Sequence, residues 1–78
     1  MNYRYIAKLN YLTELIAKEN TGNAQELAER LQVSRRTLFR YLEDLKIMGA
    51  EISYSKKQNS YVFDNVFSFF DVFFKRVL

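Results

Sequence analysis

The strongest constraint on the fold of this chain is a pair of amphipathic segments separated by only a few residues, in "NAQELAERLQVSRRTLFRYLEDLKIMG". Each segment carries apolar residues at the spacing of one helix face. In the first they are Ala24, Leu27, Ala28 and Leu31. In the second, Tyr41, Leu42, Leu45 and Met48 fall within about 80° of Leu38 when each residue turns by 100°. The pattern predicts two helices joined by a tight turn.

Capping residues place the ends of these two helices. Asn23 is a good N-cap, and Glu26 follows at the three-residue spacing of a capping box. Ser34 is the N-cap candidate of the second helix, with Val33 before it as an apolar staple. Gly49 suits the left-handed position after a helix end. We therefore expect helices from residue 24 and over residues 35 to about 48.

A third helix is predicted ahead of this pair, over residues 3–19. Its apolar face is spaced at i, i+3 and i+7 and consists of Leu9, Leu12 and Ile16. The segment "ENTGN" then interrupts the pattern. Asn20 can take a left-handed conformation at the helix end, and Gly22 marks a loop.

Two alternating runs follow the helices, in "AEISYSKKQNSYVFD". Ile52 and Tyr54 alternate with polar residues in the first run, and Tyr61 and Phe63 alternate with their neighbours in the second. The runs are separated by "KKQN", in which Asn59 can take positive φ, so they predict a β-hairpin. The fold class is mainly α with a small β-hairpin.

Length and composition exclude several classes of function. A chain of 78 residues is one domain, and the absence of Cys and His excludes a disulfide, a Cys/His zinc site and a His-based triad. No nucleophile–base pair, phosphate loop or metal cluster is present, so we expect no enzyme, no metal and no cofactor. The N-terminus lacks the apolar run of a signal peptide, and "VFSFFDVFFKRVL" is too short to span a bilayer. A cytoplasmic, nucleoid-associated protein without a membrane segment is expected.

The net charge of +3 is unevenly distributed. Residues 33–60 hold six basic and three acidic side chains, and the remainder of the chain is balanced. Arg35, Arg36 and Arg40 lie in the N-terminal half of the predicted helix 35–48. Two arginines in a first helical turn oppose the helix dipole, so they indicate an external anion. Two helices joined by a short turn, the second with a basic outer face, predict a helix-turn-helix that inserts into the DNA major groove.

The segment "AQELAERLQVSRRTLFRYLEDLKIMGAEISYSKKQNSYVF" resembles the winged helix-turn-helix of bacterial transcription regulators, as in the deoxyribose-operon-repressor and biotin-repressor families. The resemblance runs from Glu26 to Phe63 and implies a three-helix domain with a hairpin wing. It differs from the family pattern at Tyr41, where Asp is common, and at Ser60, where Gly is common. Because the chain ends soon after the predicted wing, we expect no domain that binds a small-molecule effector.

The resemblance also implies the residues that contact double-stranded DNA. Ser34, Arg36, Thr37 and Arg40 match the family's DNA-contacting positions, and Arg35 and Phe39 match its variable, specificity-bearing ones. Lys56 and Lys57 at the hairpin tip are expected to contact phosphates. The alternative is a solvated surface with ion pairs inside the chain: Arg36 with Glu29 or Glu43, and Arg40 with Glu43 or Asp44.

The segment "NVFSFFDVFFKRVL" forms an apolar tail over residues 65–78, after a winged helix-turn-helix domain at residues 1–64. Ser68, Asp71 and Lys75 make one polar stripe, so a helix over 65–77 is predicted, although the Phe and Val content also permits a strand. The apolar side chains predict a homodimer interface formed by Phe67, Phe70, Phe73 and Phe74. The alternative is a lid on the core of the same chain.

The function predicted from these features is sequence-specific binding of double-stranded DNA by a small transcription regulator. Helix 35–48 would lie in the major groove, and the hairpin wing would lie on the DNA backbone. The alternative is a winged-helix module that binds proteins instead of DNA. The basic outer face of the helix favours DNA.

Overall fold

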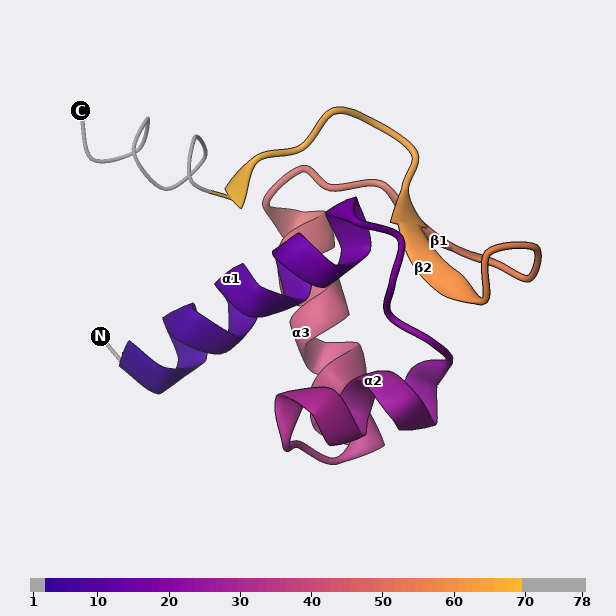
Figure 1. Ribbon diagram of the computed structural model, residues 1–78. Coiled ribbons are helices and arrows are strands. Elements are labelled where there is room, and N and C mark those ends of the chain that lie inside the picture. The colour runs from indigo at the N-terminus through magenta and orange to yellow at the C-terminus, as the bar shows by residue number, and fades with distance from the viewer. Residues whose placement is uncertain (1–2, 70–78) are drawn as a thin grey trace.

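Three helices followed by a two-stranded antiparallel hairpin make up the fold, as predicted (Figure 1). The structure is a computed structural model that describes residues 3–69. The elements are α1 (Tyr3–Ala17), α2 (Ala24–Leu31), α3 (Arg35–Ile47), β1 (Ile52–Ser55) and β2 (Ser60–Phe63). The mainly α class with a small hairpin is confirmed.

Both predicted N-caps are present. The Asn23 side chain accepts a 2.9 Å hydrogen bond from the Glu26 N–H, and the Glu26 carboxylate accepts one of 3.0 Å from the Asn23 N–H. These reciprocal bonds form the expected capping box of α2. At the start of α3, the Ser34 hydroxyl accepts a 3.0 Å hydrogen bond from the Thr37 N–H. The side chains therefore satisfy backbone donors that have no partner within the helices.

The end of α1 differs from the prediction. The helix stops at Ala17, and the left-handed residue is Glu19 (φ 54°), not Asn20. The reason is a Schellman arrangement, in which the Asn20 N–H donates to the Leu15 carbonyl at 3.1 Å and the Glu19 N–H to the Ile16 carbonyl at 3.0 Å. The hydrogen bonds at this helix end therefore place Glu19 in the left-handed conformation, although Asn20 has the higher intrinsic preference for it.

The turn between α2 and α3 contains no glycine. Gln32 takes the left-handed conformation (φ 57°) in its place, and the Val33 N–H donates to the Ala28 carbonyl at 3.0 Å. Lys8 of α1 reaches across and donates to the Leu31 carbonyl at 2.9 Å. The lysine thus ties α1 to the turn that sets the angle between α2 and α3.

The hydrophobic core is formed where the three helices meet. Its buried members are Leu9, Leu12, Leu15, Ile16, Leu27, Ala28, Leu31, Leu38, Leu42, Leu45, Ala50 and Phe69. Tyr41 of α3 and Met48, the C-cap just after it, are half-buried and pack against this cluster, as predicted from their helical spacing. The predicted apolar stripes of all three helices are therefore the faces that become buried.

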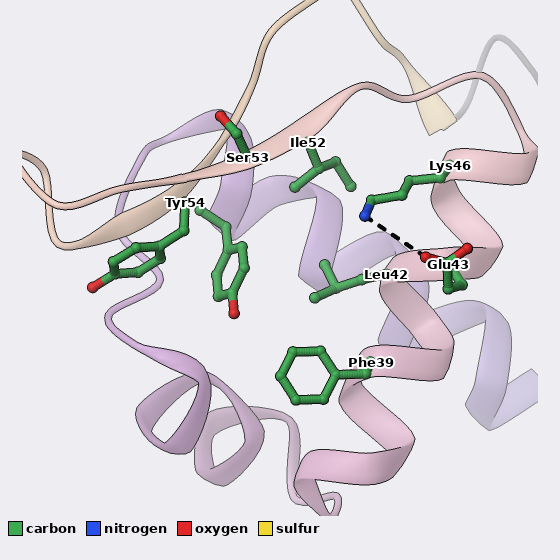
Figure 2. A pocket seen from close by; sticks show the side chains of 8 residues that line it. Phe39, Leu42, Glu43, Lys46, Ile52, Ser53 and Tyr54 are labelled. Carbon is green, nitrogen blue, oxygen red and sulfur yellow. Dashed lines mark ion pairs between the residues drawn. The ribbon is translucent and has the colours of Figure 1, made fainter.

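The hairpin and its turn form where they were predicted, and the structure adds the strand register. Ile52 pairs with Phe63 and Tyr54 with Tyr61, so all four side chains lie on one face. The Tyr54 and Tyr61 rings meet edge to face with centroids 5.1 Å apart. Asn59 has positive φ (51°), as expected for the turn. This face of the hairpin is turned toward α3, which positions it for the site described below (Figure 2).

The chain after the hairpin folds back onto the domain. The Asn65 side chain accepts a 3.0 Å hydrogen bond from the Glu51 N–H and donates one of 2.9 Å to the Gly49 carbonyl. Residues 64–68 are not helical, so the helix predicted from residue 65 does not begin there. The hydrogen bonds of Asn65 to the α3–β1 connection hold the start of this segment in a non-helical path. Most of the predicted helix lies outside the described residues.

Candidate nucleic-acid interface

The three arginines of α3, Arg35, Arg36 and Arg40, are all exposed. Leu38 and Leu42, on the helix face opposite Arg36 and Arg40, are buried. Amphipathic spacing alone accounts for this separation, because residues 36 and 40 are one helical turn apart on the face away from the leucines. The structure therefore presents a basic surface along the N-terminal half of α3.

None of the ion pairs considered for these arginines forms within residues 3–69. Glu43 instead lies 3.7 Å from the Lys46 ammonium group, and the Asp44 carboxylate accepts a hydrogen bond from the Tyr5 hydroxyl of α1. Arg36 and Arg40 have no carboxylate within ion-pair distance in the part of the chain that the structure describes. Their charge is directed to solvent or to a ligand.

The first turn of α3 combines several groups that suit an anion. It carries no acidic side chain, and its unpaired backbone N–H groups are at the positive end of the helix dipole. The Ser34 hydroxyl donates a 3.0 Å hydrogen bond to the Thr37 hydroxyl oxygen while it accepts the Thr37 N–H. In this arrangement the Thr37 hydroxyl hydrogen remains able to reach an external oxygen.

A groove of about 270 Å³ separates α3 from the hairpin (Figure 2). Its lining residues are Phe39, Leu42, Glu43, Lys46, Ile52, Ser53, Tyr54 and Tyr61. Figure 2 shows the Phe39 ring projecting from α3 on the side of the helix that faces the hairpin. Phe39 is 44% exposed, so this large apolar side chain is in contact with water at the edge of the basic surface.

The two remaining residues that were predicted to contact DNA lie at the hairpin tip. Lys56 and Lys57 are exposed in the turn between β1 and β2, and Figure 1 shows this turn projecting away from the helices. Hydrogen bonds hold the tip: the Tyr54 hydroxyl donates to the Asn59 side chain at 2.5 Å, the Gln58 N–H to the Ser55 hydroxyl at 3.2 Å, and the Asn59 N–H to the Lys56 carbonyl at 3.3 Å. The lysines are thus separate from the arginines, on a second element.

A buried polar contact that the sequence did not predict anchors the hairpin. Thr21 and Ser60 are both fully buried, and the Ser60 hydroxyl accepts a 3.0 Å hydrogen bond from the Thr21 N–H. The Thr21 hydroxyl oxygen accepts a 2.8 Å bond from the Tyr61 N–H. The signal in the sequence was Ser60 itself, which stands where related domains commonly have Gly. Its hydroxyl connects β2 to the α1–α2 loop.

Tyrosines join the elements around α3. The Tyr5 and Tyr41 rings meet edge to face with centroids 5.3 Å apart. Burial, and then the hydrogen bond to Asp44, raise the pKa of Tyr5 to about 12. Burial also raises the pKa of Tyr61, while the nearby positive charge of Arg35 acts in the opposite direction.

The predicted dimer residues are only partly within the described chain. Phe67 is half-buried, and its ring centroid lies 5.4 Å from that of Phe63 in the same chain. Phe70, Phe73 and Phe74 lie outside the described residues. Within residues 3–69, no helix is long and apolar enough to cross a membrane.

Comparison with known proteins gives one family match. The model of the family described as "HTH domain" matches residues 8–61, which include most of α1, all of α2 and α3, and the hairpin as far as Tyr61. No curated protein and no solved structure matches the chain. Because the match covers more than half of the sequence and coincides with the observed three helices and hairpin, the chain belongs to the helix-turn-helix domain family, a non-enzymatic, DNA-binding kind of domain.

Proposed function

We propose that this protein is a transcription regulator that binds double-stranded DNA sequence-specifically, with α3 in the major groove and the hairpin as a wing on the backbone. The observation that carries the proposal is the exposed basic surface of α3, where Arg36 and Arg40 have no acidic partner within residues 3–69. The major groove is about 12 Å wide and admits one helix. Arginine can donate two hydrogen bonds to one guanine or bind a phosphate.

The first turn of α3 would bind backbone phosphate. Ser34 positions the Thr37 hydroxyl, and the backbone N–H groups beside them complement negative charge. Arg35 and Phe39 would contribute to sequence preference from the side of α3 that faces the hairpin. Lys56 and Lys57 would contact phosphates from the wing tip, because a projecting turn suits positioning better than base reading.

The role in transcription, the cellular location and the dimer are parts of the same proposal. The resemblance to the deoxyribose-operon-repressor and biotin-repressor helix-turn-helix supports a role in transcription and a location at the nucleoid. We assign the DNA-binding domain to residues 1–64. The tail from residue 65 would join two copies, so that two α3 helices reach a pseudopalindromic site about 34–36 Å apart.

The test is a fluorescence titration of the intact protein with random-sequence duplex at several salt concentrations. Arg36→Ala and Arg40→Ala should each weaken binding, by roughly 1–3 kcal/mol where the arginine reads a base. Folding should be unchanged, because both side chains are exposed. The matched control is Lys18→Ala, which removes one positive charge from an exposed residue just after α1, outside α3 and the hairpin.

Two results would contradict the proposal. One is an intact protein that fails to bind duplex DNA even at low salt. The other is a double variant, Arg36→Ala with Arg40→Ala, that binds as tightly as the unmodified chain. A loss confined to Lys18→Ala would place the interface elsewhere on the molecule.

A further inference from the structure

The exposed ring of Phe39 is unusual for its position in α3. It is 44% exposed, while the other apolar residues in the N-terminal half of the helix are buried or half-buried against the core. Phe39 is not a member of the buried cluster. Within residues 3–69 its ring also pairs with no other aromatic ring, since Tyr54 and Tyr61 pair with each other. Phe39 therefore lines the groove beside the hairpin without joining the core or an aromatic pair, and part of its ring stays open to a ligand.

The neighbours of Phe39 on the helix surface are basic. Residues three and four positions apart are adjacent on a helix, so Phe39 lies one turn after Arg35 and Arg36. Both arginines are exposed. If α3 brings these guanidinium groups to the DNA major groove, it therefore brings the Phe39 ring there as well.

The chemistry of the major groove restricts what this ring can contact. Most of the exposed base edges there are hydrogen-bond donors and acceptors, and a phenyl ring can satisfy none of them. The one apolar group that a base pair presents is the C5-methyl of thymine. We infer that Phe39 is a specificity-determining residue that packs on a thymine methyl group, so that the preferred site contains thymine beside the bases read by Arg35 and Arg36. This inference rests on the proposed DNA binding.

The experiment begins by selecting preferred duplexes from a random pool with the intact protein. Each thymine of the selected site is then replaced singly by uracil, which removes the methyl group and leaves base pairing intact. Binding by the unmodified protein should weaken about fourfold at one or two thymine positions, as expected for exposing one buried methyl group. Phe39→Ala should be weaker on the thymine duplex and insensitive to uracil at those positions.

Two variants serve as controls. Phe39→Leu keeps apolar contact and should retain part of the discrimination. Ile47→Ala truncates another exposed apolar residue of α3, 77% exposed near its C-terminal end, and should discriminate thymine from uracil as the unmodified protein does.

The outcomes separate this inference from the function on which it rests. Binding that is indifferent to every uracil replacement overturns the inference alone, as does an equal sensitivity in Phe39→Ala. Failure of the unmodified protein to bind any duplex overturns the proposed function and the inference together. The uracil measurements use the unmodified protein, so they remain decisive if Phe39→Ala folds poorly.

Discussion

The Ser60 hydroxyl of β2 lies 3.0 Å from the backbone nitrogen of Thr21, which precedes it by 39 residues in the chain. It accepts the Thr21 N–H, and the Thr21 hydroxyl oxygen in turn accepts the Tyr61 N–H. Both side chains are fully buried. These hydrogen bonds hold the wing on the α1–α2 loop. Because the two side chains are buried, water cannot take the place of either partner.

Ser60→Ala should lower the free energy of unfolding by about 1–3 kcal/mol, because the Thr21 N–H would be left buried without its acceptor. Urea denaturation followed by circular dichroism measures this. Ser53→Ala is the control, since Ser53 is exposed in β1 and its bond to Asp64 is open to water. Its loss should stay within about 0.5 kcal/mol. Equal losses in the two variants would show that burial of Ser60 is unimportant.

Replacement of Lys56 and Lys57 by Ala should weaken DNA binding uniformly across sequences. The dependence of log affinity on log salt concentration should flatten by about one to two units, because each lost phosphate contact releases about one fewer counterion. Titrations of one preferred and one random duplex over a salt series measure both effects. If affinity falls for the preferred duplex alone, the wing reads bases.

High pH should destabilise the fold partly through Tyr5. Its folded-state pKa of about 12 lies above the ordinary value of 10.0 because of burial and the hydrogen bond to Asp44. This contribution is complete below pH 10 and is lost as the pH rises toward 12, since the unfolded chain ionises first. Urea midpoints between pH 8 and 11.5 should therefore fall less steeply in Tyr5→Phe. A parallel decline in both proteins would assign the effect to other groups.

If the tail joins two copies as proposed, the oligomeric state should depend on the tail. Sedimentation of the intact chain at micromolar concentration should show a dimer, and Phe70→Asp or Phe74→Asp should give folded monomers, because a buried carboxylate in the interface is unfavourable. Ile47→Asp changes an exposed apolar residue of α3 outside the tail and should leave the dimer intact. A clean monomer of the unmodified chain would rule out the dimer.

Helix positions and the basic surface could be predicted from local patterns. The capping box at Asn23, the N-cap at Ser34 and the leucine spacing of α3 each act over three to seven residues. Such short-range preferences survive folding because the tertiary structure buries the same stripes that they define. The exposure of Arg36 and Arg40 follows from the same periodicity.

Contacts between distant segments were decided only by the tertiary structure. The partners Thr21–Ser60, Lys8–Leu31 and Tyr5–Asp44 are 39, 23 and 39 residues apart, and no periodic signal links them. The choice of Glu19 over Asn20 as the left-handed residue likewise depended on which carbonyls the end of α1 left available. Composition and periodicity therefore determined which faces are buried and which are basic. The packing of three helices and a hairpin determined which buried polar groups meet, because each of those groups needs a partner that the chain supplies only when folded.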